Sequence, residues 1–146
     1  MGRDPTIAAP RGISGPFVPL IAAQAAHSVE EYLGKLYEVF PPARFVSGLV
    51  SSDLRRGFVI ANGVLIALGL LCFLGPVRGS WRPARAIAWA WVGLEILNGT
   101  GHLGWSLLEG RYTPGLATAP LLVLLALHLA RRLVVTAGPT SSRGNR

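Results

Sequence analysis

The feature that most constrains this chain is a set of long apolar runs with almost no charge inside them. The cleanest is FVIANGVLIALGLLCFL, over 58–74. A helix needs about 20 mostly apolar residues to cross the hydrocarbon core of a bilayer. Only 14% of the residues are charged and the mean hydropathy is +0.45, whereas about 25% of the residues in a typical soluble domain are charged. The pattern predicts an integral membrane protein.

Four runs of this kind predict an all-α fold, a four-helix transmembrane bundle. We place the spans at about 17–37, 58–74, 85–108 and 114–135, with a short interfacial helix near 45–54. The length of 146 residues fits one membrane domain over 17–135. The polar stretch 1–16 is expected to be a flexible tail, and the Ser/Gly/Arg-rich stretch 136–146 a disordered basic tail.

Basic residues at the ends of the spans predict the orientation of the bundle. With four spans, both tails and the 75–84 loop share one side, and that side carries the larger share of the 14 Lys and Arg residues: Arg3, Arg11, Arg78, Arg82, Arg85, Arg131, Arg132, Arg143 and Arg146. Both termini are therefore expected to be cytoplasmic, in a bacterial cell membrane. The net charge of +7 does not indicate a nucleic-acid partner, because no basic stripe with interleaved aromatics accompanies it.

The first span carries a polar cluster in its second half. His27 and Glu31 are four residues apart and share one helical face, with Glu30 beside them. Ionisable groups at membrane depth are costly and usually mark a functional site. The alternative is that this is a helix end at the interface, with both carboxylates in water.

The third span carries a second polar stripe, formed by Glu95, Asn98 and His102 on one face. Glycines around it permit close approach of a neighbouring helix, which we expect to be the first span. Both stripes lie at overlapping depths, so they are expected to converge. Structural roles remain open for Glu95, as a hydrogen-bond partner, and for His102, as a core residue. Four further side chains are expected to line a substrate pocket there: Tyr32, Asn62, Trp105 and Thr118.

These motifs together resemble one known family. His27-x-x-Glu30-Glu31, then Asn98-Gly99 and His102, then the segment YTPG at 112–115 with Thr118, occur in the order found in the HXXEE-domain family of small multi-span membrane proteins. The resemblance covers about 17–135. It implies that His27, Glu30, Glu31, Asn98 and His102 form the family site, and it names no reaction.

The residue types point to acid/base chemistry. Three glutamates in a medium of low dielectric cannot all be ionised without compensation, so at least one is expected to hold a proton. We therefore expect catalysis by His27, Glu30, Glu31, Glu95, Asn98 and His102 on a hydrophobic small molecule, as in an isomerase, a cyclase or an epoxide-opening enzyme.

Two alternatives stay open. No cofactor is expected, but the Glu and His side chains could bind zinc or iron in a metal-dependent enzyme. The chain could instead be a non-catalytic carrier or subunit. Membrane lipid is an expected partner in each case, and a homo-oligomer is compatible with all three hypotheses.

Overall fold

The computed structural model describes residues 12–136, and these fold into helices without any strand. The elements are α1 (Ser14–Leu33), α2 (Leu36–Val39), α3 (Pro41–Val50), α4 (Leu54–Cys72), the π-helical turn η2 (Phe73–Val77), α5 (Ala84–Glu109) and α6 (Ala119–Val135). The all-α prediction is confirmed. Most of each predicted tail, 1–11 and 137–146, lies outside the described residues.

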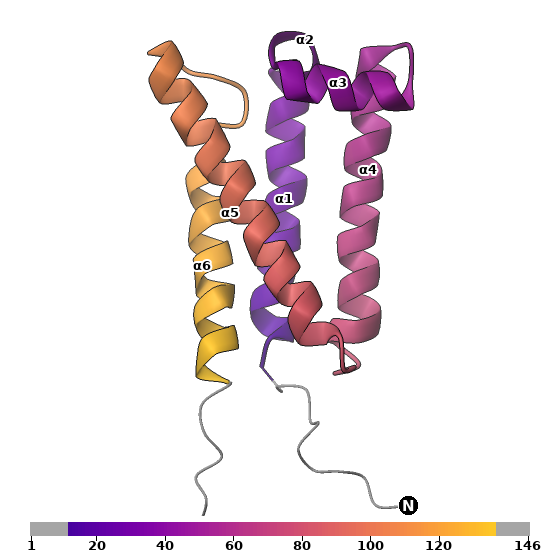
Figure 1. Cartoon of the computed structure of the whole chain (residues 1–146), viewed down its shortest axis with the longest axis vertical. Coiled ribbons are helices and arrows are strands. Elements are labelled where there is room, and N and C mark those ends of the chain that lie inside the picture. Colours follow the sequence, from indigo (N-terminus) through magenta and orange to yellow (C-terminus); the bar gives the residue numbers. More distant parts are fainter. Residues whose placement is uncertain (1–11, 137–146) are drawn as a thin grey trace, which may run out of the picture.

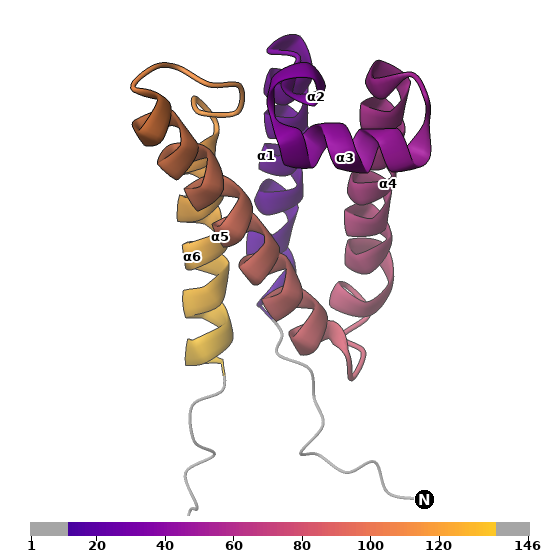
Figure 2. The ribbon, with the colours of Figure 1, turned by 45° about the horizontal axis from the view of Figure 1, so that its top comes forward.

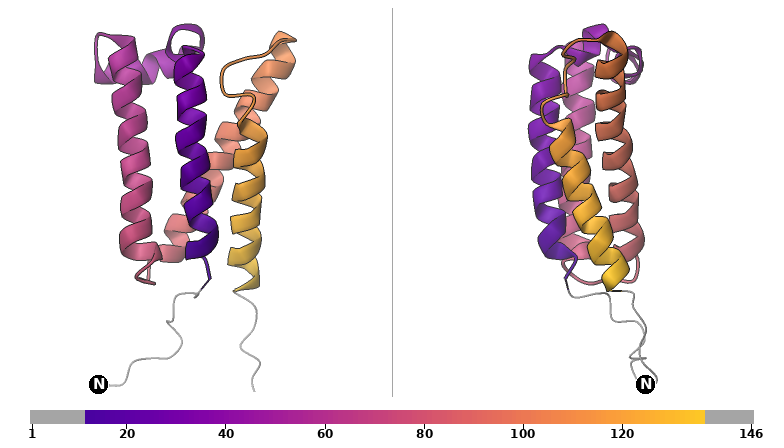
Figure 3. Two further views of the ribbon diagram at one scale, coloured as in Figure 1. Left: turned by 180° about the vertical axis from the view of Figure 1, so that it is seen from behind. Right: turned by 90° about the vertical axis from the view of Figure 1, so that its left-hand side faces the viewer.

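Four long helices run side by side along the length of the molecule, and a short one crosses one end (Figure 1). α3 lies across the tops of α1 and α4 in that view, and Figure 2 shows it in front of them. The start of α1, the end of α6 and the turn from η2 to α5 share the opposite end, as the views from behind and from the side also show (Figure 3). This up-and-down order matches the predicted order of the four long helices.

Several helix boundaries differ from the prediction for local reasons. α1 ends at Leu33 rather than near 37, because Lys35 adopts a left-handed backbone conformation with φ of 55°. The expected helix between the first two spans is α3, and Pro41 begins it, since proline suits the first turn of a helix. The last helix begins at Ala119 rather than at 114, because a loop of turns precedes it.

The core lies between α1, α5 and α6. Phe17 and Trp91 meet edge to face with 6.1 Å between ring centroids, and buried leucines of α6 complete this cluster. Gly99 of α5 lies against α6, where an added Cβ would be 2.9 Å from the carbonyl oxygen of Ala119. The prediction that the α5 glycines approach the first span was therefore wrong: the close approach at Gly99 is to α6, and Gly93, Gly101 and Gly104 have no neighbour within 4 Å of an added Cβ.

One segment of the described chain, Leu54–Val77, is long and apolar enough to cross a membrane by its length and composition. The prediction of four spanning helices is thus confirmed only as four long helices in an all-helical molecule. Apolar side chains nevertheless point outward from more than one helix. Exposed examples on α4 and α6 are Val59, Val64, Leu68, Leu71, Leu121, Leu124 and Leu127.

Candidate functional site

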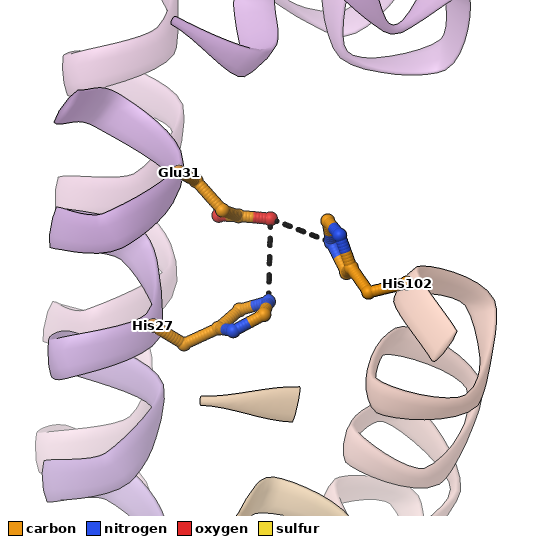
Figure 4. Close-up of side chains that lie close together, drawn as sticks. All are labelled: His27, Glu31 and His102. Atoms are coloured by element: carbon orange, nitrogen blue, oxygen red, sulfur yellow. Dashed lines mark hydrogen bonds and ion pairs between the residues drawn. The ribbon is translucent and has the colours of Figure 1, made fainter. Parts of the chain in front are cut away.

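The centre of the candidate site is a carboxylate between two imidazoles. Glu31 Oε1 lies 3.0 Å from Nε2 of His102 and 3.4 Å from Nε2 of His27. Figure 4 shows Glu31 and His27 projecting from α1 toward His102 of α5. All three side chains are buried. The two predicted polar stripes therefore converge, and they do so at Glu31.

A glycine from a distant loop packs against both imidazole rings. The rings of His27 and His102 meet edge to face, with 4.7 Å between centroids. A Cβ on Gly115 would lie 2.6 Å from Cε1 of His102 and 2.9 Å from Cε1 of His27. Gly115 also has a φ of +94°, a conformation that side chains disfavour. The site thus requires glycine at this position for two separate reasons.

Glu30 points away from this centre and binds the loop between α5 and α6. Its carboxylate accepts hydrogen bonds from three backbone N–H groups, those of Gly115 (3.1 Å), Ala117 (2.9 Å) and Thr118 (2.8 Å). It also accepts from the hydroxyl groups of Tyr112 and Thr118. Since the loop leads into α6, the carboxylate lies at a helix N-terminus, where negative charge is stabilised. Glu30 therefore fixes the loop that supplies Gly115.

Tyr112 is an exposed member of this loop. Its hydrogen bond to Glu30 raises the pKa of Tyr112 to about 12. The phenol consequently stays protonated, and available as a donor to Glu30, throughout the neutral pH range.

Thr118 connects the loop to the histidine pair. Its Oγ1 donates to Oε2 of Glu30 and lies 2.6 Å from Nδ1 of His27. Glu30 and His27 of the same helix are thus linked through a side chain more than 80 residues away.

A second row of polar side chains begins at Glu95 of α5 and continues through Gln24 and Ser28 of α1 to Asn62 of α4. Glu95 is fully buried, and its Oε2 lies 2.7 Å from the terminal amide of Gln24. The Gln24 amide nitrogen lies 3.2 Å from Oγ of Ser28. The Ser28 hydroxyl donates to Oδ1 of Asn62 at 2.7 Å, and the Asn62 amide donates to the carbonyl oxygen of Phe58 at 3.1 Å.

The protonation state of Glu95 determines which groups donate and which accept in this row of hydrogen bonds. With Glu95 ionised, the Gln24 amide must turn its nitrogen toward the carboxylate, and the Ser28 hydroxyl would then face two acceptors with one proton. With Glu95 protonated, the acid donates to the Gln24 oxygen, Gln24 donates to Ser28 and Ser28 donates to Asn62. The second arrangement satisfies every group in the row, which favours a protonated Glu95.

A cavity of about 540 Å³ opens beside these groups. Glu31 and His102 reach its wall, together with the amides of Gln24, Asn62 and Asn98. α3 contributes Pro42, Ala43, Val46 and Ser47. The remaining lining residues are apolar: Leu36, Phe40, Phe58, Ala61, Leu65, Leu94 and Leu97. A smaller cavity of about 140 Å³ adjoins His102 between Phe40 and Trp105.

The structure separates the predicted site residues into groups. His27, Glu31 and His102 are in contact, and Asn62 and Asn98 line the large cavity. Glu95 is buried behind Gln24, and Glu30 and Thr118 belong to the loop contact. Tyr32 lies apart, where its phenol accepts from Arg55 Nε at 2.7 Å. Trp105 packs on Phe40, with 4.6 Å between ring centroids.

Three site residues were missed in the sequence: Gln24, Ser28 and Gly115. The first two carry a readable signal, because Gln24, His27, Ser28 and Glu31 follow helical spacing on one face of α1. Gly115 carries a weaker signal, as part of a Pro-Gly turn. Its contact with the histidines depends on the fold of the loop.

The central cluster also has the geometry of a metal-binding group. One ligand atom each from His27, Glu31 and His102 lies within 4.8 Å of the others. Two imidazoles and a carboxylate suit zinc or iron. Chemically, the same three groups can therefore transfer protons or bind a cation.

Comparison with known proteins adds the family and no more. A family model described as "Protein of unknown function with HXXEE motif" matches residues 18–129. No curated protein and no solved structure matches the chain. The match covers most of the sequence and includes the residues of the motif, His27, Glu30 and Glu31. The chain therefore belongs to the HXXEE family.

Proposed function

We propose that this protein is an integral membrane enzyme that transforms a lipophilic small molecule by His/Glu acid/base chemistry. The observation that carries the proposal is the position of Glu31 and His102: both belong to a buried His/Glu cluster and both line a largely apolar cavity of about 540 Å³. Ligand sites in proteins commonly combine such an apolar cavity with a few convergent polar groups.

The cavity lining favours an uncharged substrate. Glu31 and His102 are the ionisable groups among the described residues that line it, and none of those residues is Lys or Arg. A phosphate or carboxylate on the substrate would therefore meet no fixed positive partner. Asn62 and Asn98 offer neutral amides instead, which suit a hydroxyl, carbonyl or epoxide oxygen.

The chemistry can be assigned to atoms. A protonated Glu31 donates to an alkene, carbonyl or epoxide of the substrate, and the resulting carboxylate removes a proton from a neighbouring carbon. The substrate gains one proton and loses one, as in an isomerisation or cyclisation. Nε2 of His102 lies 3.0 Å from Oε1 of Glu31, and the tautomer with the proton on Nε2 donates to Glu31 and stabilises the negative charge that develops on it. His27 lies behind Glu31 and is fully buried, so it exchanges protons with Glu31 rather than with the substrate.

The apolar side chains on the outer surface support the proposal that the protein lies in a membrane. Leu54–Val77 has the length and composition of a membrane span. Large apolar side chains are also exposed on α5 and α6, such as Leu107 and Leu124. Exposed apolar patches of this extent are rare in soluble monomers. We therefore propose that all four long helices span the bilayer and that a lipophilic substrate reaches the cavity from it.

Conversion of a lipophilic extract tests the proposal. Purified protein in detergent is incubated in D₂O with the neutral lipid extract of the producing cells, and products are followed by mass spectrometry. The wild type is expected to generate a new species or to introduce deuterium into an existing one. Glu31→Gln is expected to reduce the rate by about 10²- to 10⁴-fold, the range typical of a general acid/base.

Glu38→Gln is the matched control, because Glu38 is exposed and its ion-pair partner among the described residues is the exposed Lys35, 3.9 Å away. It is expected to retain the wild-type rate. Conversion by Glu31→Gln at the wild-type rate, with both variants folded, would exclude Glu31 as the catalytic acid.

A metal-dependent enzyme is the second candidate, favoured by the three ligand atoms within 4.8 Å of one another. Metal analysis of protein purified without chelator tests it. Stoichiometric zinc or iron in the wild type that is lost in His27→Ala and Glu31→Gln would support this candidate. Protein that remains at background metal after incubation with zinc and with Fe²⁺ would count against it.

A further inference from the structure

We infer that Glu30 and Thr118 are positioning residues that fix the tautomer of His27, with the proton on Nδ1 and a free lone pair on Nε2, the nitrogen directed at Glu31. The arrangement would give the first glutamate of the HXXEE motif a task distinct from that of the second. Its importance for catalysis rests on the proposed function, whereas the tautomer itself follows from the hydrogen bonds alone.

Glu30 is ionised in this arrangement. Three backbone N–H groups of the loop point at its carboxylate, at 2.8–3.1 Å. A backbone N–H can only donate, so each of these groups requires an acceptor at Glu30. The ionised carboxylate provides acceptor positions on both oxygens, which makes Glu30 the fixed negative end of the arrangement.

The hydroxyl group of Thr118 has a single proton to donate. Oγ1 donates it to Oε2 of Glu30, the oxygen that also accepts from the Thr118 backbone N–H. The lone pairs of Oγ1 then remain for its other neighbour, Nδ1 of His27, at 2.6 Å. A hydrogen bond at that distance needs a proton, and only Nδ1 can supply it.

A proton on Nδ1 leaves Nε2, the other ring nitrogen of His27, without one. In a neutral imidazole one nitrogen carries the proton and the other a lone pair, so Nε2 of His27 is bare. This atom is buried and has no hydrogen-bond partner within residues 12–136, and it lies 3.4 Å from Oε1 of Glu31. Two lone pairs that face each other at this distance bind one proton between them, or one metal ion.

The spacing of the motif explains why the two glutamates differ. Successive residues of an α-helix are separated by about 100° around its axis. Glu31 therefore shares the His27 face, while Glu30 faces the N-terminus of α6. Glu30 nevertheless influences His27, because Oγ1 of Thr118 is hydrogen-bonded to both side chains.

Histidine tautomers can be measured directly. Protein labelled with ¹⁵N-histidine is studied in detergent by NMR, with a chelator present and at a pH where His27 is neutral, and His27→Gln assigns the resonances. In the wild type and in Thr118→Ser, His27 is expected to show a protonated Nδ1 and a bare Nε2. In Thr118→Val, which removes the acceptor, the Nδ1–H population is expected to fall and the Nε2–H population to rise.

Thr100→Val is the control, because the hydroxyl of Thr100 is exposed and bonds to its own helix at the carbonyl oxygen of Ile96. It should leave His27 unchanged. A wild-type His27 protonated on Nε2, or a Thr118→Val spectrum identical to that of the wild type, would overturn the inference. Because Thr118→Ser restores the hydroxyl, its agreement with the wild type distinguishes the hydrogen bond from a general disturbance of the fold.

The same variants separate this inference from the proposed function. If His27 shows the expected tautomer but Glu31→Gln converts substrate normally, the proposed function fails and the positioning role stands. If Glu31→Gln is inactive while Thr118→Val changes neither the tautomer nor the rate, the positioning role fails and the proposed function stands.

Discussion

At the scale of single residues, two adjacent glutamates of one motif meet different surroundings. Glu31 lies between two imidazoles at the cavity, whereas Glu30 is surrounded by backbone donors at a helix N-terminus. Three bonds to backbone N–H groups make Glu30 a fixed anchor. Glu31 instead contacts Nε2 of His27, a nitrogen that has no hydrogen-bond partner within the described residues. No other hydrogen bond therefore fixes where the proton between Glu31 and His27 lies.

Gly115 provides a prediction about the histidine pair. Gly115→Ala places a Cβ 2.6 Å from the His102 ring and on a backbone with φ of +94°. We expect a loss of about 1–3 kcal/mol in the free energy of unfolding, since a residue held in such a conformation carries strain of that order. Denaturation in detergent measures it.

Gly101→Ala is the matched control, because an added Cβ there meets nothing within 4 Å. It should be neutral or stabilising by up to about 1 kcal/mol, the helix propensity difference between the two residues. Equal behaviour of the two variants would contradict the packing described for Gly115.

Glu95 provides a prediction about charge. A proton on Glu95 gives every member of the row from Glu95 to Asn62 a hydrogen-bond partner. Infrared spectra at neutral pH should therefore contain a carboxylic acid C=O band that disappears in Glu95→Gln and persists in Glu109→Gln. A difference spectrum showing loss of carboxylate bands instead would establish an ionised Glu95.

At the scale of elements, α3 forms one wall of the cavity, and a close contact between the backbones of α3 and α4 holds it there. A Cβ on Gly57 of α4 would lie 2.0 Å from the carbonyl oxygen of Ser47 in α3. Backbone atoms cannot move aside as a side chain can. The position of α3, and with it that of Val46 and Pro42 at the cavity, therefore depends on this glycine.

Gly57→Ala is expected to displace α3 and to cost about 1–3 kcal/mol, the usual range for overpacking. The midpoint of thermal unfolding and the conversion rate in the extract assay should both fall. Gly63→Ala on the same helix meets nothing within 4 Å and should lower neither of them, with a gain in stability of up to about 1 kcal/mol from helix propensity. A Gly57→Ala protein with wild-type stability would show that α3 is not held by this contact.

At the scale of the whole molecule, the ends of the bundle carry a prediction about topology. The η2–α5 turn lies at the same end as the start of α1 and the end of α6, and the α3–α4 turn lies at the other (Figure 1). Ser80 and Ser52 are exposed in these turns. With cytoplasmic termini, the α3–α4 turn faces outward and the η2–α5 turn faces the cytoplasm.

Single-cysteine labelling in a Cys72→Ala background tests this arrangement. A membrane-impermeant thiol reagent should label Ser52→Cys in intact cells and Ser80→Cys only after permeabilisation. The reverse pattern would place the termini outside, and labelling of both in intact cells would contradict a four-span protein.

The sequence by itself determined the all-helical class, the order of the four long helices and the residues of the two polar stripes. These follow from periodicity, since helical spacing places His27 with Glu31, and Glu95 with His102, whatever else the chain does. The family follows from the same motifs. Local rules carry this information because each concerns residues within two turns of one helix.

Only the tertiary structure decided what each polar residue does. The separate tasks of Glu30 and Glu31, the contact of Gly115 with both histidines and the link from Thr118 to His27 all depend on how the helices and the loop before α6 pack together; His27 and Thr118, for example, are 91 residues apart in the sequence. The glycines of α5 misled the prediction for the same reason, since a glycine permits close approach without specifying the neighbour. Which helix fills that space depends on how the whole bundle packs.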